Sequence, residues 1–229
     1  RQLVLSRRQV ALGLAVVPLA GCAPARPDKD VAFIPAKQAK SLAATDPGRL
    51  VELVKLDPTI RLDMRYATTN NFTGTVLYSE ARAFLTAPAA QAVVRASRTA
   101  RAEGFGLTIF DAYRPWRVTK KLWDATPVGP KKEYVANPKR GSKHNRGCAV
   151  DLSLHDLATG ELVEMPTGFD DFSEKAHRDY MGASAVAIEN RARLQRYLEA
   201  EGFVGLSNEW WHFDFTGWEK FPVLDIPFD

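Results

Sequence analysis

The sequence predicts an α+β fold in which a mainly antiparallel sheet is flanked by helices. Some segments show the 3.6-residue periodicity of amphipathic helices, and others show the alternation or the short apolar runs of strands. The strands do not alternate strictly with the helices, as they would around a parallel sheet. The chain has 229 residues, 45% of them hydrophobic and 25% charged, which suits one globular domain.

The first 21 residues have the composition of an export signal. Arg7 and Arg8 precede a mostly apolar stretch, residues 9–21, which is shorter than the roughly 20 residues of a bilayer span. Leu19-Ala20-Gly21-Cys22 resembles the lipobox of bacterial lipoproteins, which implies cleavage before Cys22 and a lipid on its sulfur. An uncleaved N-terminal anchor is the alternative. The paired arginines also resemble a twin-arginine signal.

Residues 22–49 carry several prolines and charges and predict a tether. Residues 50–229 are predicted to form the folded domain. Lipidation of Cys22 would leave Cys148 as the only thiol, so no intramolecular disulfide is expected. Three arginines of the export signal account for most of the net charge of +4, and the nearly neutral remainder gives no reason to expect a nucleic-acid partner.

Three elements are predicted before residue 105. Thr59–Tyr66 alternates apolar with polar residues, which predicts a half-buried strand. Residues 68–74 are polar and predict a loop. Residues 86–104 predict a helix, with Thr86 as its cap and Gly104 at its end.

The second half of the chain predicts two further helices and three strands. Residues 126–141 are rich in proline and basic side chains and predict a loop, either a lid or a rim. The buried face of the last helix is predicted to contain Ile188, Ala192, Gln195 and Leu198, widened by Leu194 and Tyr197. The strands are expected at 107–111, 148–154 and 209–215, and the helices at 116–124 and 184–201.

Residues 142–151 contain two candidate metal ligands, His144 and Asp151. A carboxylate in the apolar strand around Asp151 is costly to bury without a partner, and a divalent cation would offset that cost. Residues seven apart on a straight strand face opposite ways, so a shared metal requires a bend, which Gly147 permits. A structural hydrogen bond for His144 and an ion pair for Asp151 are the alternatives.

A second segment, residues 209–215, supplies His212 and Glu209. Together with His144 and Asp151, His212 could hold a zinc ion with one coordination position open. Glu209 would lie on the turn before the strand and act as the base for a zinc-activated water. Trp210 and Trp211 belong to the core or keep the site dry. The chemistry expected of this set is amide hydrolysis.

An oxyanion formed in such a reaction needs a positive partner besides the metal. Arg114 follows the predicted strand 107–111, and its planar, permanently charged head suits that role. A structural ion pair is the alternative for Arg114.

These motifs resemble those of a known enzyme family. Ser142-x-His144-x-x-Gly147-x-Ala149-x-Asp151 with Glu209-x-x-His212 is similar to the zinc D-Ala-D-Ala peptidases, which share a fold core with hedgehog signalling domains. The stretches 61–74, with Asn-Asn-Phe-x-Gly, and 111–115, with Tyr-Arg-Pro, resemble the D-alanyl-D-alanine dipeptidase branch, which includes the vancomycin-resistance dipeptidase. The resemblance covers about residues 50–225.

The resemblance implies a role for each matching residue. His144, Asp151 and His212 would bind one zinc ion per chain, Glu209 would be the base, and Arg114 would stabilise the transition state. Ser142 and Asp170 match positions that hold the dipeptide, and Asp170 would pair with its free ammonium group. Asp171 offers an alternative register for that role.

The sequence therefore predicts a zinc dipeptidase that splits D-Ala-D-Ala into two D-alanines at the bacterial cell envelope. It would be anchored by lipid on Cys22, facing the periplasm or the cell exterior, with a small-molecule substrate and no protein partner. One alternative is a zinc D,D-carboxypeptidase that trims longer peptidoglycan stem peptides. Another, from a different class, is a non-catalytic envelope-binding module with a structural metal.

Overall fold

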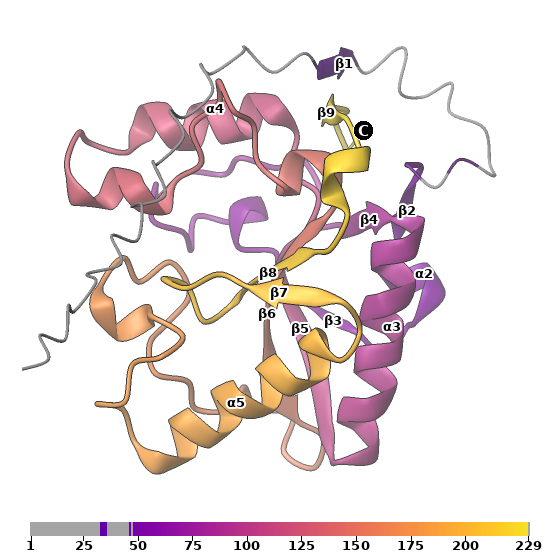
Figure 1. Cartoon of the computed structure of the whole chain (residues 1–229), viewed down its shortest axis with the longest axis vertical. Coiled ribbons are helices and arrows are strands. Elements are labelled where there is room, and N and C mark those ends of the chain that lie inside the picture. Colours follow the sequence, from indigo (N-terminus) through magenta and orange to yellow (C-terminus); the bar gives the residue numbers. More distant parts are fainter. Residues whose placement is uncertain (1–32, 36–45, 47, 229) are drawn as a thin grey trace, which may run out of the picture.

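The computed structural model describes residues 33–35, 46 and 48–228 (Figure 1). The predicted export signal and Cys22 lie outside the described residues, as does most of the predicted tether. Within that tether, Phe33–Pro35 forms strand β1, which pairs in parallel with β9, Val223–Asp225. The first element of the predicted domain is β2, Leu50–Glu52, which pairs antiparallel with β4, Phe84–Thr86.

A five-stranded sheet forms the centre of the molecule, in the order β3-β5-β6-β8-β7. Only β3 and β5 run parallel, and every other neighbouring pair in this sheet is antiparallel. The predicted α+β class with a mainly antiparallel sheet is confirmed. The strands are Arg61–Leu62 (β3), Phe105–Asp111 (β5), Ala149–Asp156 (β6), Phe203–Gly205 (β7) and His212–Phe215 (β8).

Helices flank this sheet. The helix α3 packs against β5 and α5, while α4 lies next to β9 at the opposite end of the view in Figure 1 from α5. The helices are Leu53–Leu56 (α2), Ala87–Ala102 (α3), Trp116–Ala125 (α4) and Ala185–Glu199 (α5). The 3-10 turns are Arg65–Ala67, Pro130–Tyr134, His144–Arg146, Glu174–Ala176 and Trp218–Lys220. No helix within the described part of the chain is both long and apolar enough to cross a membrane.

The helix α3 begins and ends close to the predicted positions, but Thr86 does not cap it with its side chain. The Thr86 hydroxyl instead donates to the carbonyl of Gly147, 3.2 Å away. This bond ties the start of α3 to the segment before β6. Gly104 follows the helix with φ +89°, a left-handed conformation that favours glycine.

The predicted buried face of α5 was displaced. Ala192 is exposed, while Ile188 and Gln195 are only half-buried. The observed buried face consists of Ala187, Asn190, Arg191, Leu194, Tyr197 and Leu198. Arg191 is buried because its guanidinium donates to the carbonyls of His177 and Tyr180, at 3.1 and 2.7 Å. Polar groups that satisfy loop carbonyls therefore share the core face, which a hydrophobic pattern does not report.

The strand predicted at Thr59–Tyr66 is also shorter than expected. Only Arg61–Leu62 pairs with β5, and a 3-10 turn begins at Arg65. The alternation of burial persists across the turn, since Met64 and Tyr66 are buried. Tyr66 is thereby directed towards the cavity described below.

Candidate metal centre

The start of β6 brings the first two predicted ligands together. His144 lies on a 3-10 turn, and Gly147 adopts φ +63° before the strand begins at Ala149. A Cβ at Gly147 would lie 2.6 Å from the Leu50 side chain, so both the conformation and the close approach require glycine. This is the bend that a shared metal site needs, and it lets Asp151 face the same cavity as His144.

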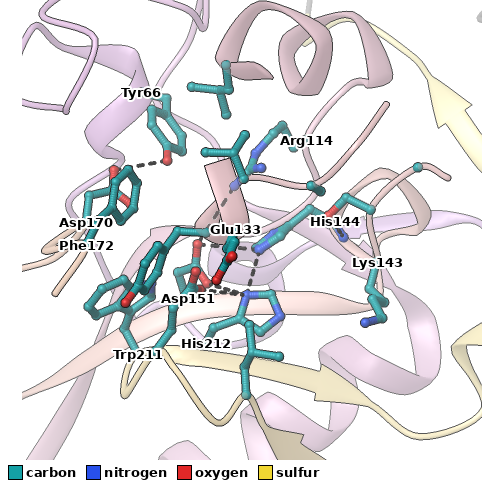
Figure 2. A pocket seen from close by; sticks show the side chains of 18 of the residues that line it. Tyr66, Arg114, Glu133, Lys143, His144, Asp151, Asp170, Phe172, Trp211 and His212 are labelled. Atoms are coloured by element: carbon teal, nitrogen blue, oxygen red, sulfur yellow. Dashed lines mark hydrogen bonds and ion pairs between the residues drawn. The ribbon is translucent and has the colours of Figure 1, made fainter. Parts of the chain in front are cut away.

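The third predicted ligand comes from the neighbouring strand. Asp151 and His212 are directly paired in the antiparallel register of β6 and β8. His212 Nδ1 lies 3.0 Å from Asp151 Oδ1 and 3.2 Å from His144 Nε2, and His144 Nε2 lies 3.4 Å from Asp151 Oδ2 (Figure 2). One donor atom from each residue lies within 4.8 Å of the others, and all three side chains are buried. The arrangement is compatible with a single cation bound by all three.

The other ring nitrogens of both histidines are occupied. His144 Nδ1 donates to the carbonyl of Ala112 at 2.6 Å, and His212 Nε2 donates to Asp214 Oδ1 at 2.8 Å. These bonds fix the ring orientations and leave His144 Nε2 and His212 Nδ1 directed at the shared space. Asp214 was missed in the sequence. Its position two residues after His212 on one strand, which places both on the same face, was the available signal.

The triad is electrostatically coupled. Burial alone would raise the pKa of Asp151, but the two neighbouring imidazoles hold it well below its usual range. Burial alone would lower the pKa of His212, but its hydrogen bonds to Asp151 and Asp214 raise it well above the ordinary value. Protons and a metal ion therefore compete for the same ring nitrogen.

Glu209 lies on the turn between β7 and β8, as predicted, with Oε2 3.8 Å from His212 Nδ1. Burial raises the pKa of Glu209 to about 7, opposed by His212 and reinforced by Asp151. A carboxyl group with a pKa near neutrality can accept and return a proton at neutral pH. Its position beside the triad, outside the set of three converging donors, suits a base better than a ligand.

Arg114 enters the site from the loop after β5. Its Nε and Nη2 donate to Asp111 Oδ2 at 2.9 and 2.7 Å, and Nη2 lies 3.9 Å from Asp151 Oδ2. Burial works to lower the pKa of Arg114, but Asp111 and other nearby acidic groups raise it well above its ordinary value. The guanidinium is therefore a fixed positive charge in a buried site. The alternative structural ion pair, with Asp111, is present, and the side chain still lines the cavity.

The two residues predicted to hold a dipeptide also line this cavity. Ser142 Oγ accepts the backbone N–H of His144 at 3.2 Å. Asp170 adopts φ +59°, and its Oδ2 accepts the hydroxyl of Tyr66 at 3.0 Å. Burial raises the pKa of Asp170 well above its usual range, with further repulsion from Asp151 and Glu209. Asp171 does not line this cavity, which favours the Asp170 register.

The cavity has a volume of about 360 Å³, and its lining contains both acidic and basic side chains. Asp170 and Phe172 lie on one side of the triad and Lys143 on the other (Figure 2). The segment predicted as a lid or rim contributes Glu133, Tyr134 and Arg140 to the lining. Charged groups of both signs therefore surround the triad.

Three converging ligand atoms, a buried carboxyl with a raised pKa and a buried arginine define a metal-dependent hydrolase centre in an α+β domain. The family model for Peptidase M15, described as D-ala-D-ala dipeptidase, matches residues 46–223. The chain belongs to this family of peptidases, as its motifs predicted, and it is therefore a member of an enzyme family.

Two relatives with the same family name are similar to the chain over most of their length. The chain is 36% identical over 180 residues to the D-alanyl-D-alanine dipeptidase of Escherichia coli strain K12, covering 79% of this chain and 91% of the relative. It is 37% identical over 171 residues to the D-alanyl-D-alanine dipeptidase of Enterococcus faecium, covering 67% of this chain and 85% of the relative.

Solved structures show only a distant likeness. VanYB in complex with D-alanine-D-alanine has a TM-score of 0.39 and 17% identity, covering 63% of this chain and 78% of its own. The D,D-dipeptidase VanXYg with a phosphinate analogue has a TM-score of 0.39 and 19% identity, covering 59% and 51%. At these values the likenesses do not bear on the function of the chain.

Proposed function

We propose that the chain is a zinc-dependent D-alanyl-D-alanine dipeptidase that splits D-Ala-D-Ala into two D-alanines. The observation that carries the proposal is the convergence of His144, Asp151 and His212 beside Glu209 in a chain of the D-Ala-D-Ala dipeptidase family. The two relatives described above, which are 36% and 37% identical to this chain over the matched residues, are named for this activity.

The donor set fits zinc. Two imidazole nitrogens and one carboxylate oxygen are typical zinc ligands, and three protein ligands leave a position open, as in catalytic zinc sites. The hydrogen bonds from His144 to Ala112 and from His212 to Asp214 provide the supporting contacts that such ligands need. When bound, zinc would supply Lewis acidity that makes water nucleophilic at neutral pH.

Glu209 would accept the proton of the attacking water and return it to the leaving amine. Burial, which raises the pKa of Glu209, and its position beside His212 support this role. The leaving amine is the nitrogen of the C-terminal alanine. Two free D-alanines are then the products.

Arg114 would stabilise the negative charge that develops on the carbonyl oxygen. A buried arginine held by Asp111 needs little reorganisation during the reaction, which makes its field effective. Asp170 would pair with the free ammonium group of the substrate, and Ser142 would contact the dipeptide near the metal ligands. This charge pattern favours a free dipeptide over a longer peptide, whose amide at the same place carries no charge.

We also propose that the protein acts at the cell envelope, attached by lipid on Cys22. The support is the Leu-Ala-Gly-Cys sequence after a basic and then apolar stretch. Radiolabelled palmitate should be incorporated by the full-length chain in a bacterial host and not by Cys22→Ser. Equal labelling of both proteins, or of neither, would contradict the anchor.

The dipeptidase proposal is tested with purified, zinc-loaded protein and three substrates: D-Ala-D-Ala, L-Ala-L-Ala and N-acetyl-D-Ala-D-Ala. Free alanine should appear rapidly from the first only. Glu209→Ala should lose turnover and still bind about one zinc ion per chain. Rapid cleavage of the acetylated substrate would instead favour a carboxypeptidase, and bound zinc without cleavage of any substrate would favour a binding module.

A further inference from the structure

Asp111, at the end of β5, is a fully buried carboxylate with four hydrogen-bond donors. Arg114 supplies two of them to Oδ2, as described above. Oδ1 accepts the backbone N–H of Ala112 at 2.9 Å and the hydroxyl of Tyr78 at 2.6 Å. Both oxygens are thus held, so the plane of the carboxylate is fixed.

Tyr78 contributes the one side-chain bond to Oδ1. Its ring is 3% exposed and does not line the substrate cavity. The backbone N–H of Tyr78 donates to Tyr66 at 2.9 Å, and its ring lies edge-on to Phe228 at 4.7 Å. The hydroxyl therefore has a defined position, set from outside the catalytic cavity.

The fixed carboxylate of Asp111 in turn orients Arg114. Its Nε and Nη2 are committed to Asp111 Oδ2, so the orientation of the carboxylate determines where the remaining nitrogen, Nη1, is directed. Nη1 has no hydrogen-bond partner among the described residues, and Arg114 lines the cavity. A rotation of Asp111 would swing this nitrogen relative to His144, Asp151 and His212.

We propose that Tyr78 is a positioning residue that acts through Asp111 to aim the Arg114 guanidinium at the reacting carbonyl. Phe228 secures Tyr78 by packing against its ring, which connects the segment after β9 to the active site. The role in turnover rests on the dipeptidase function proposed above. The effect of Tyr78 on the orientation of Arg114 does not depend on that function and can be tested by structure alone.

The chain contains a matched control in Tyr113. Its ring also packs edge-on against Phe228, at 6.0 Å, and its hydroxyl is likewise in hydrogen bonds. Those bonds are to the backbone of Ile226, as donor to its carbonyl at 3.1 Å and acceptor from its N–H at 2.7 Å. Tyr113→Phe removes a phenol hydroxyl beside the same ring without touching Asp111.

The experiment compares Tyr78→Phe with Tyr113→Phe. Tyr78→Phe should lower kcat for D-Ala-D-Ala about tenfold with KM within about twofold, because the aim of Arg114 matters most in the transition state. Affinity for a phosphinate analogue of the dipeptide, which mimics the tetrahedral state, should fall by a similar factor. Tyr113→Phe should leave kcat, KM and analogue affinity within about twofold of the unsubstituted chain.

Crystal structures of both variants provide the readout that needs no activity. Arg114 Nη1 should move in Tyr78→Phe and stay in place in Tyr113→Phe. An unmoved Arg114 with unchanged kcat in Tyr78→Phe would overturn the proposal, as would equal losses of kcat in the two variants. If the unsubstituted chain fails to cleave D-Ala-D-Ala, the proposed function falls and the position of Arg114 alone decides the claim about Tyr78.

Discussion

At the scale of single residues, the metal centre depends on groups that do not touch the metal. Ala112 and Asp214 each hold one imidazole in a single orientation. Lys143 Nζ lies 3.2 Å from Asp214 Oδ2, so the carboxylate that orients His212 is itself held. We therefore expect the loss of Asp214 to lower metal affinity almost as much as the loss of a metal ligand would.

Asp214→Asn tests this dependence. An amide can still present an oxygen to His212, but it loses its charge and its pairing with Lys143. Zinc affinity measured by competition with a chelating dye should fall about 10- to 100-fold. Asp124→Asn, which alters an exposed ion pair on α4, serves as the control and should bind zinc as the unsubstituted chain does. Equal affinity in the two variants would remove Asp214 from the site.

The site residues that could be predicted from the sequence are those that lie in short motifs. His144, Asp151, Glu209 and His212 lie in two short motifs, and the bend at Gly147 follows from the spacing within one of them. The bond from Tyr78 to Asp111 required the tertiary structure, since the phenol lies 33 residues from the carboxylate. Spacing along the chain says nothing about such a contact.

At the scale of elements, the turn before β6 is where backbone geometry decides the site. Gly147 has φ +63°, and an added Cβ would meet the Leu50 side chain at 2.6 Å and the backbone nitrogen of Thr86 at 3.1 Å. The backbone of Thr86 also donates to the carbonyl of Gly147 at 2.8 Å. Displacement of this turn would move His144 relative to Asp151.

Gly147→Ala should therefore destabilise the domain by about 2 to 4 kcal/mol, from left-handed strain of about 1 kcal/mol plus the steric conflict. Gly74→Ala is the matched control, because Gly74 has φ +65° and open space around its Cα. The control should cost only about 1 kcal/mol. Urea unfolding measures both, and equal losses would show that the turn has room for a side chain.

A second element-scale feature is a partition beside the substrate cavity. Phe72, Asp170 and Phe172 line both this cavity and a neighbouring one of about 510 Å³. The rings of Phe72 and Phe172 meet edge-on at 5.1 Å, and Tyr134 stacks on Phe172 at 5.1 Å. This wall lies at the Asp170 side of the site, where the proposed pairing of Asp170 with the substrate ammonium group would place an N-terminal extension.

Phe172→Ala should open the partition. Its ratio of activity towards a tripeptide ending in D-Ala-D-Ala over that towards the dipeptide should rise at least about tenfold, because the steric barrier falls while Asp170 remains. Leu162→Ala, on an exposed side chain, is the control and should leave the ratio unchanged. Chromatography of the released products measures the ratio, and an unaltered ratio in Phe172→Ala would mean that the wall does not set peptide length.

At the scale of the whole molecule, Arg82 connects the first and last parts of the domain. Its guanidinium donates to both oxygens of Glu52 at 2.9 Å and to the carbonyl of Phe228 at 3.3 Å. The Arg82 hydrogen bonds lower the pKa of Glu52 from 4.5 to about 2, against the effect of burial. Because the pKa of Glu52 is depressed in the folded state, its pair with Arg82 stabilises the fold fully above about pH 4.5. This stabilisation is lost as the pH falls towards 2.

Glu52→Gln should make unfolding less sensitive to acid. The free energy of unfolding of the unsubstituted chain should decline more steeply between pH 5 and 2 than that of the variant, and the variant should be less stable at pH 7. Glu80→Gln removes the exposed second partner of Arg82 and should leave the slope nearly unchanged. Parallel pH profiles for Glu52→Gln and the unsubstituted chain would contradict the assignment.

The fold class was predictable because the types of the elements follow from hydrophobic periodicity. Which face of each element is buried was harder to predict. The buried side of α5 includes Asn190 and Arg191, whose polar atoms bind loop carbonyls. The strand predicted from Thr59 ended early because the chain turns at Arg65. At α5 tertiary hydrogen bonds outweighed the local pattern, whereas at Arg65 a local turn, with Thr68 N–H donating to the carbonyl of Arg65, ended the strand.

Anomalous diffraction at the zinc edge, from crystals of the zinc-loaded protein, would show whether His144, Asp151 and His212 share one cation. We expect one strong peak per chain, about 2.0 to 2.2 Å from His144 Nε2, His212 Nδ1 and an Asp151 oxygen. A peak bound elsewhere, or the absence of a peak between these residues at saturating zinc, would contradict this expectation.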